Sequence, residues 1–316
     1  MARILVTTDY LHPGDEVDAL LRRHGHQVSY RPAAGTRAAD EALTLFNCIA
    51  GAIMASEPVT ADMLAKATEL KVIARSGVGY DSIDVTAAAA RGIRVCNTPG
   101  VNHHAVAELT VALMLIAARR LRAVIDGVRA GAWPREAGHE LRGATLALLG
   151  YGPSGRAVAQ LGAAFGMTVL VHTAHPDPDD SSIQFVDRDT AIATADYLSL
   201  HSRAGSPTTR RIINDDALRA MKSTAVLINT ARGALVDEHA LTAALRTGQI
   251  AGAALDVVDS EPLPADSPLR GLDNVIITSH LAGQTVEART RAGLAAAHEV
   301  LAVLDGREPQ HPVDRT

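Results

Sequence analysis

The chain is poor in cysteine, in aromatic side chains and in long apolar runs. Its two cysteines, Cys48 and Cys96, lie in apolar stretches, and the sequence has no Cys-x-x-Cys pair and no cluster typical of a zinc site. We therefore expect two small buried hydrophobic side chains and no bound metal. Because no run reaches about 18 apolar residues and the apolar run after Met1 is too short for a signal peptide, we expect no membrane span and a cytoplasmic location.

An excess of one charge sign is also missing. The formal net charge is −5 and the sequence pI is about 6.2, so there is no electrostatic reason to expect a nucleic acid or an anionic membrane as partner. An anionic small substrate would need a local positive site. The 47% hydrophobic and 21% charged residues fit a soluble protein with a sizeable core, and the 3% aromatic content fits α/β layers packed through Ala and Val.

What the sequence does contain is an alternation of strand-like and helix-like segments. Thr60 is predicted to cap a helix, and Asp81 and Asp84 are predicted to occupy a turn and a helix cap. Repeated β-α units indicate a mostly parallel sheet covered by helices. In the first part of the chain the strands are predicted at 3–8, 48–54, 71–77 and 93–97, and the helices at 14–25, 60–70 and 82–92.

Two longer segments each predict a long helix, with a second β-α series between them. The segment 103–131 predicts one helix of about 25 residues or more that ends at Gly131, and 283–306 predicts another. We therefore expect a discontinuous domain at 1–98 plus 287–316, with a second domain inserted at 99–286. The predicted fold class is α/β, with two Rossmann-like, doubly wound parallel-sheet domains.

A glycine-rich turn lies in the middle of the chain, at "GYGPSGR". Its spacing, with Gly150, Gly152 and Gly155, is that of a dinucleotide-binding turn, and an apolar strand precedes it while a helix follows. The first glycine permits the tight turn, the second lets backbone amides approach a pyrophosphate, and the third lets the helix lie close to the strand. The helix N-terminus then favours the phosphate charge.

The carboxylate that usually follows such a turn, at the end of the next strand, is absent. The strand end has Thr173, Ala174 and His175 in its place. Since an acidic group there would repel a 2′-phosphate, its absence removes the discrimination against NADP. His175 either assists a phosphate or is an exposed loop histidine, and Asp177 remains able to reach a ribose. The expected cofactor is NAD or NADP, with a slight preference for NADP.

Three polar residues follow later strands of the inserted domain, at the sheet edge where ligands of doubly wound folds bind. Arg232 follows "VLINTA", Glu261 lies in "DSEP", and His280 ends "VIITSH". Taken singly, each is also explained as a loop charge, a turn or a cap. Together they suit hydride transfer to a carbonyl: a histidine acid/base, a carboxylate that orients it, and an arginine that holds a substrate carboxylate.

These segments resemble the D-isomer-specific 2-hydroxyacid dehydrogenase family over nearly the whole chain. The likeness rests on "GYGPSG", "NTARGALVDE", "ALDVVDSEP" and "SHLAGQT", together with 75–84 and 97–110 in the first half. It implies an oxidoreductase that transfers a hydride between NAD(P)H and a small 2-oxo acid to give a D-2-hydroxy acid. It also implies Arg232 as the substrate-orienting residue, Glu261 as partner of the histidine, His280 as general acid/base, and a homodimer formed around the nucleotide domains.

The resemblance also supplies the residues expected to contact each ligand. Those implied for the substrate are Ser76, Gly77, Val78, Arg232 and His280. Those implied for the cofactor are Gly150, Tyr151, Gly152, Pro153, Ser154, Gly155, Thr173, His175, His201, Thr230, Ala231, Asp256 and Gly283.

The chain departs from the family pattern at two further places. The segment 201–210 lacks the usual Pro-Leu pair, so the shape of this loop is open, and Arg203 and Arg210 either face a phosphate or are exposed. Ala55 stands about where phosphoglycerate dehydrogenases often have an arginine, which argues against a phosphorylated substrate.

Several alternatives stay open at the level of sequence. His103 and His104 either contact substrate or are surface residues of a first helical turn, and Trp133 either reaches a neighbouring subunit or anchors packing. The fold also serves nucleotide-sensing, corepressor-like binding proteins, which are the alternative function. Enzymes of the same fold that act on formate or phosphite find no positive support in the residues.

Overall fold

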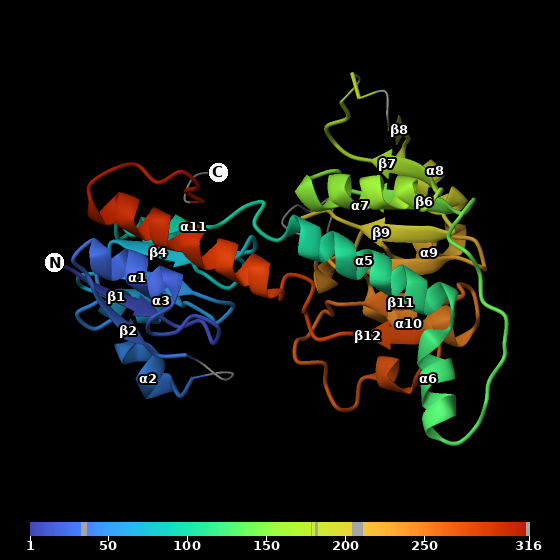
Figure 1. The fold of residues 1–316 in the computed structure, drawn as a ribbon, viewed down its shortest axis with the longest axis horizontal. Helices are drawn as coiled ribbons and strands as arrows, with labels where there is room; N and C mark the ends of the chain where they lie inside the picture. Colours follow the sequence, from blue (N-terminus) through green and yellow to red (C-terminus); the bar gives the residue numbers. More distant parts are fainter. Residues whose placement is uncertain (33–36, 178, 181–182, 204–210, 314–316) are drawn as a thin grey trace. The chain divides into compact units, whose positions relative to one another are not determined.

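The computed structural model describes residues 1–32, 37–177, 179–180, 183–203 and 211–313 (Figure 1). The chain divides into two compact units, Met1–Asn102 with Gln284–Thr316 and His103–Gly283. We call them unit 1 and unit 2. The expected boundaries after residues 98 and 286 lie close to these divisions. No helix in the described ranges is long and apolar enough to cross a membrane.

Unit 1 is built on a five-stranded parallel sheet with the order β2-β1-β3-β4-β5. The expected β-α alternation is present, and β2 and α2 are additions that the sequence pattern did not predict. The elements are β1 (Arg3–Val6), α1 (Glu16–Arg23), β2 (Gln27–Tyr30), α2 (Ala39–Thr44), β3 (Gly51–Met54), α3 (Ala61–Lys66), β4 (Val72–Arg75), α4 (Val85–Ala89), β5 (Arg94–Cys96) and α11 (Val286–Leu304).

The two faces of this sheet pack against different helices, because alternate strand residues point to opposite sides. Ile4 and Val6 of β1 pack with α1 and with Ala297 and Val300 of α11, whereas Leu5 packs on the other face with α3 and α4. Figure 1 shows α11, in red, running along the sheet beside α1. The last helix of the chain is therefore part of the core of the first unit.

Unit 2 has a seven-stranded parallel sheet with the order β12-β11-β10-β9-β6-β7-β8. The chain starts in the middle, at β6, moves outward to β8, and then returns to β9 on the other side of β6. Its elements are α5 (His103–Ala118), α6 (Leu121–Arg129), β6 (Thr145–Leu149), α7 (Pro153–Ala164), β7 (Thr168–His172), β8 (Gln184–Phe185), α8 (Arg188–Thr194), β9 (Tyr197–Leu200), α9 (Asp215–Ala220), β10 (Val226–Asn229), α10 (Glu238–Arg246), β11 (Gly252–Leu255) and β12 (Val275–Ile277).

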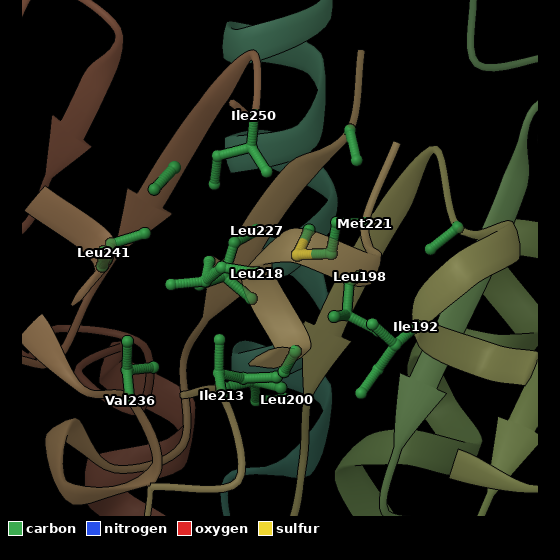
Figure 2. Packing of buried hydrophobic residues seen from close by; sticks show 14 of the residues in the cluster. Ile192, Leu198, Leu200, Ile213, Leu218, Met221, Leu227, Val236, Leu241 and Ile250 are labelled. Atoms are coloured by element: carbon green, nitrogen blue, oxygen red, sulfur yellow. The ribbon is translucent and has the colours of Figure 1, made fainter. Parts of the chain in front are cut away.

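This strand order places a topological switch point between β6 and β9, and ligands of doubly wound sheets bind beyond the carboxyl ends of the strands there. The strands are buried on both sides, as in β9 and β11, where every residue is buried. Figure 2 shows one of the two packed faces, where Leu198, Leu200 and Leu227 of the sheet meet Ile192 of α8 and Leu218 of α9. On the opposite face, α5 and α7 cover the sheet.

The expected single helix over 103–131 is wrong, because the structure has two helices there. Arg120, with φ 49° and ψ 36°, lies in the left-handed region and separates α5 from α6. The carbonyl of Ala118 accepts the amide of His139 at 2.8 Å, and a β-carbon on Gly138 would lie 2.7 Å from that carbonyl oxygen. The returning chain thus satisfies the end of α5, and the apolar pattern alone does not show this break.

The expectation that both cysteines are buried is also wrong for one of them. Cys96 is buried at the end of β5, but Cys48 is exposed. Cys48 lies in a turn after α2 with φ 59°, and the neighbouring Leu45 and Phe46 fill the core in its place. The two expected helix caps are present: Thr60 accepts the amide of Met63 at 3.4 Å, and Asp84 accepts that of Ala87 at 2.8 Å.

Candidate active site

The glycine-rich turn joins β6 to α7 at the switch point of the unit 2 sheet. Gly150 has φ 110°, and a β-carbon on it would lie 2.6 Å from the carbonyl carbon and oxygen of His201. A β-carbon on Gly155 would lie 2.5 Å from the carbonyl oxygen of Gly150. Both glycines are thus required by close backbone approach, whereas a β-carbon on Gly152 would meet no atom within 4 Å. The turn is packed on its inner side and open at Gly152.

The first turn of α7 is arranged to receive an anion. Gly152 is the N-cap, with no side-chain hydrogen bond to the helix start, and Pro153 occupies the first turn. Since Pro153 has no amide hydrogen, the donors available to a phosphate are the amides that follow it, beginning with Ser154. Backbone amides and the helix dipole both favour a phosphate at this position. The residues present therefore fit a dinucleotide.

The end of β7 lacks a carboxylate in the structure, as the sequence indicates. Thr173 follows the strand and its hydroxyl accepts the amide of His175 at 3.3 Å. His175 and Asp177 are both exposed. Residues 173–175 therefore offer a hydroxyl and an imidazole to a ribose or to its phosphate and no carboxylate, and the nearest carboxylate that follows in the chain is that of Asp177.

A charged cluster that the sequence interpretation missed lies beside the glycine-rich turn. The Tyr151 hydroxyl donates to Asp180 at 3.2 Å, and Arg156 pairs with Asp180 at 3.7 Å. The guanidinium of Arg156 lies 4.3 Å from the centre of the Tyr151 ring. Burial, and next the charge of Asp180, raise the pKa of the Tyr151 hydroxyl. The feature of the sequence that could have pointed to this cluster is Arg156, which directly follows the third glycine of the turn.

His201 follows β9 and lies against the glycine-rich turn. Its amide donates to the carbonyl of Leu149 at 2.8 Å, and its Nε2 lies 2.9 Å from the Ser199 hydroxyl. Removal of the imidazole from water lowers the pKa of His201 to about 4. The ring is therefore neutral at physiological pH. Arg203 is exposed, and Arg210, with the rest of 204–210, lies outside the described residues.

The turn after β10 holds Arg232 through the side chain of a buried residue, Asn229. The side-chain Oδ1 of Asn229 accepts a hydrogen bond from the backbone amide of Ala231 at 3.1 Å. The side-chain Nδ2 of Asn229 donates to the backbone carbonyl of Arg232 at 2.8 Å. Thr230 is buried, and its hydroxyl lies 3.0 Å from that of Thr110 on α5. The backbone on both sides of Arg232 is thus fixed. The feature of the sequence that could have pointed to Asn229 is its amide side chain at the end of an apolar run.

A second close approach joins this turn to the loop that follows β11. A β-carbon on Gly233 would overlap the carbonyl oxygen of Val258 and would lie 2.5 Å from the amide nitrogen of Asp259. Only glycine allows the two backbones to lie this close. Arg232 and the loop that contains Glu261 are therefore held as neighbours by the main chain.

Glu261 and His280 are brought into direct contact. The Glu261 Oε2 lies 2.7 Å from the His280 Nδ1, and the Glu261 Oε1 accepts the Val258 amide at 3.2 Å. Burial opposes ionisation of Glu261, but the hydrogen bond and charge of His280, with Val258 and Arg232, lower its pKa below the usual range. The side chains stay 49% exposed for His280 and 37% for Glu261, so the imidazole remains accessible to a substrate.

The backbone at His280 is fixed by a buried carboxylate. His280 has φ 56°, and its amide donates to the carbonyl of Asp256 at 2.8 Å. The Asp256 carboxylate accepts the amides of Leu281 and Ala282 at 2.9 and 2.8 Å, and the Thr278 hydroxyl at 2.5 Å. Asp256, expected near the cofactor, therefore uses its carboxylate to hold the turn that presents the histidine.

The expected substrate loop of unit 1 is equally well ordered by internal hydrogen bonds. The backbone amide of Ser76 donates to the carbonyl of Met54 at 2.9 Å, and the backbone amide of Gly77 donates to the Thr98 hydroxyl at 2.8 Å. The Asn97 NH2 donates to the carbonyl of Val78 at 2.7 Å. The amide of Val78 has no such internal partner among the described residues, so it is one donor of this loop that is available to a ligand.

His103, His104 and Trp133 are the remaining candidates from the sequence. The rings of His103 and His104 lie 4.0 Å apart at the start of α5, and Trp133 is 79% exposed. Within the described ranges, no group of three or more His, Cys, Asp or Glu side chains is placed to hold a metal ion.

Comparison with known proteins agrees with this geometry. Residues 111–282 match the family model described as D-isomer specific 2-hydroxyacid dehydrogenase, NAD binding domain. A glyoxylate reductase from Thermofilum pendens is 40% identical over 270 residues, which is 82% of this chain and 79% of that protein.

Solved structures match almost the whole chain. The TT0316 protein from Thermus thermophilus is 40% identical, with a TM-score of 0.91 over 98% of this chain and 99% of that chain. An NADPH-dependent glyoxylate/hydroxypyruvate reductase from Sinorhizobium meliloti is 31% identical, with a TM-score of 0.85 over 99% of this chain and 98% of that one. The predicted family and the predicted fold class, with its two parallel-sheet α/β units, are thereby confirmed. The chain belongs to the D-isomer specific 2-hydroxyacid dehydrogenase family and is an oxidoreductase that uses NAD or NADP.

Proposed function

We propose that this protein reduces small 2-oxo acids, of the size of glyoxylate or hydroxypyruvate, to D-2-hydroxy acids. The observation that carries the proposal is the 2.7 Å contact between Glu261 and His280, in a turn next to that of Arg232. The names of the relatives support the same substrate class. Unit 2 would hold the cofactor, and unit 1, through the loop at Ser76, Gly77 and Val78, would hold part of the substrate.

Each of the three side chains has a role that follows from its chemistry. Arg232 binds the substrate carboxylate through two parallel hydrogen bonds and polarises the adjacent carbonyl. His280 donates a proton to the carbonyl oxygen as that oxygen becomes a hydroxyl, and accepts it in the reverse direction. Glu261 keeps Nδ1 protonated and stabilises the imidazolium form. Bound NADH or NADPH supplies the hydride.

NADP is slightly favoured over NAD in this proposal. The end of β7 has Thr173 and His175 in place of a carboxylate, so no fixed negative charge there opposes a 2′-phosphate. The Sinorhizobium meliloti relative is NADPH-dependent. The cofactor-contacting set remains Gly150, Tyr151, Gly152, Pro153, Ser154, Gly155, Thr173, His175, His201, Thr230, Ala231, Asp256 and Gly283. Thr230 and Asp256 would contribute mainly by ordering the backbone.

The test is a panel of 2-oxo acids offered to purified protein with NADH and NADPH in parallel, followed by nicotinamide absorbance. We expect turnover with both cofactors or with NADPH in preference, and His280→Asn should lower kcat by about 10²- to 10⁴-fold while cofactor binding is retained. Cofactor binding without turnover of any acid would overturn the proposal and favour the nucleotide-sensing, corepressor-like alternative.

We also propose that the protein is a homodimer formed through unit 2. Leu121, Ile125 and Val128 of α6 are 36%, 49% and 45% exposed, and their spacing places them on one face of the helix. An apolar stripe of this kind, with the exposed Trp133 beyond it, is typical of a subunit interface. Light scattering should give the mass of a dimer for the wild type and of a monomer for Ile125→Asp, and a wild-type monomer would contradict the proposal.

A further inference from the structure

The carboxylate of Glu238 points from the start of α10 to the loop that contains Glu261. Its Oε1 accepts the backbone amide of Asp259. An acidic residue in a first helical turn often serves only the helix start, but here Asp237 is the cap, because its Oδ1 accepts the amides of His239 and Ala240 at 3.1 Å each. Glu238 is therefore not needed by its own helix and is committed to the neighbouring loop.

Two successive amides of that loop are held by carboxylates. The Val258 amide donates to Glu261 at 3.2 Å, and the next amide, of Asp259, donates to Glu238. The carbonyl of Val258 is at the same time in backbone contact with Gly233. The loop is thus fixed on one side by α10, on another by the turn of Arg232, and internally by Glu261. Removal of the Glu238 acceptor would take away one of these three attachments of the segment whose position sets the Glu261–His280 contact.

Glu238 also adds a negative charge close to Glu261. Burial raises the pKa of the Glu238 carboxyl, the amide of Asp259 opposes this, and the charges of Asp259 and Glu261 raise it further. Next to Glu238 in the chain are the capping Asp237, which pairs with Arg211 at 3.4 Å, and His239. Arg232 and His280 act on the charge of Glu261, the next carboxylate along the loop. The negative charge of Glu238 therefore lies close enough to Glu261 for the two carboxylates to repel each other.

We propose that Glu238 is a positioning residue for the reaction. It holds the Val258–Glu261 loop through the Asp259 amide, and its charge adds to that of Glu261 in favouring the protonated form of His280. This inference rests on the proposed function, in which His280 donates the proton.

Two variants separate the hydrogen bond from the charge. Glu238→Gln keeps an acceptor for the Asp259 amide and removes the charge, while Glu238→Ala removes both. The matched control is Glu16→Ala, because Glu16 is also the first residue of a helix after a capping aspartate, Asp15, and is exposed. The readouts are kcat/KM against pH, the midpoint of urea unfolding, and the NMR titration of the His280 ring.

We expect Glu238→Gln to keep kcat/KM within about threefold at its optimum, and to move the limb of the pH profile that reports the protonated histidine down by roughly half a pH unit, the size expected for partly exposed charges. Glu238→Ala should lower kcat/KM by about tenfold to a hundredfold, since small displacements at a reacting centre are costly. The Glu16→Ala control should match the wild type.

Two results would overturn the inference. One is an unshifted pH limb and an unshifted His280 titration in Glu238→Gln. The other is a Glu238→Ala variant whose activity is unchanged, or falls only as its folded fraction falls. A wild type without turnover would refute the proposed function, whereas the NMR titration still decides whether Glu238 acts on His280.

Discussion

His201 is the group whose protonation should most affect the stability of the cofactor-binding unit on the acid side. Its pKa falls from 6.5 to about 4 on folding because the imidazole leaves water. The unfolded chain therefore binds a proton at a higher pH than the folded chain does. The stability that this group contributes is complete above about pH 6.5 and is lost as the pH falls toward about 4.

The size of the effect follows from the two pKa values. Between pH 7 and pH 5 the unfolded histidine becomes almost fully protonated while the folded one stays neutral, which removes about 2 kcal/mol from the free energy of unfolding. His201 is partly exposed as a residue, so this figure is an upper bound. It is a substantial part of the 5–15 kcal/mol typical of a folded domain.

The assay is urea unfolding of the ligand-free protein at pH 7 and pH 5, for the wild type and for His201→Gln. The glutamine keeps a polar group within reach of Ser199 and cannot titrate, so the variant should lose about 2 kcal/mol less than the wild type between the two pH values. His175→Gln, which removes an exposed histidine of the same unit, is the control and should retain the wild-type difference. Equal pH dependence in the wild type and in His201→Gln would refute the reasoning, as would an NMR titration of His201 with its midpoint near pH 6.5.

Three further results are expected from the geometry of the site. Gly233→Ala should lower the free energy of unfolding by more than about 2 kcal/mol, because its β-carbon would overlap the carbonyl of Val258; an unchanged urea midpoint would contradict this. Thr173→Asp should raise the ratio of kcat/KM for NADH to that for NADPH by at least about tenfold, since a carboxylate there accepts the ribose hydroxyl and repels a 2′-phosphate; an unaltered ratio would show that another group selects the cofactor. Glu261→Gln should lower kcat/KM by about tenfold to a hundredfold and move the acid-form limb of the pH profile to lower pH, because His280 loses a charged partner; a profile identical to the wild type would exclude that role for Glu261.

The fold was predictable wherever a local pattern encodes it. The buried strand β3 is a continuous apolar run, and it lies within the strand expected at 48–54. The edge strand β2 was missed because only alternate residues of "QVSY" are partly buried, so its apolar signal is weak. The break at Arg120 was missed for another reason: it depends on the amide of His139 and on the missing side chain of Gly138, which lie well beyond it in sequence.

The same distinction applies to the candidate site. Arg232, Glu261 and His280 were predicted as site residues from their positions after parallel strands, because the ends of such strands meet at one edge of the sheet. The residues that hold them were not found, since Asn229, Gly233 and Glu238 act through backbone groups of other segments. A sequence pattern shows which side chains suit a reaction, but it does not show which amide each of them will hold.

The divided course of unit 1 has a consequence for how the protein is made on the ribosome. The strands of its sheet emerge first, but one face of that sheet is covered by Ala296, Ala297, Val300 and Leu301 of α11, all of them almost fully buried. At about 5–20 residues per second, roughly 10 to 40 seconds of synthesis separate the last strand of unit 1 from this helix. During that interval unit 2 can fold from one continuous stretch of chain. The helix that covers one face of the unit 1 sheet has not yet been made, so that face stays uncovered at Ile4, Val6, Ile53 and Val72. Chaperone dependence should therefore be greatest for chains that have passed β5 and have not yet reached α11.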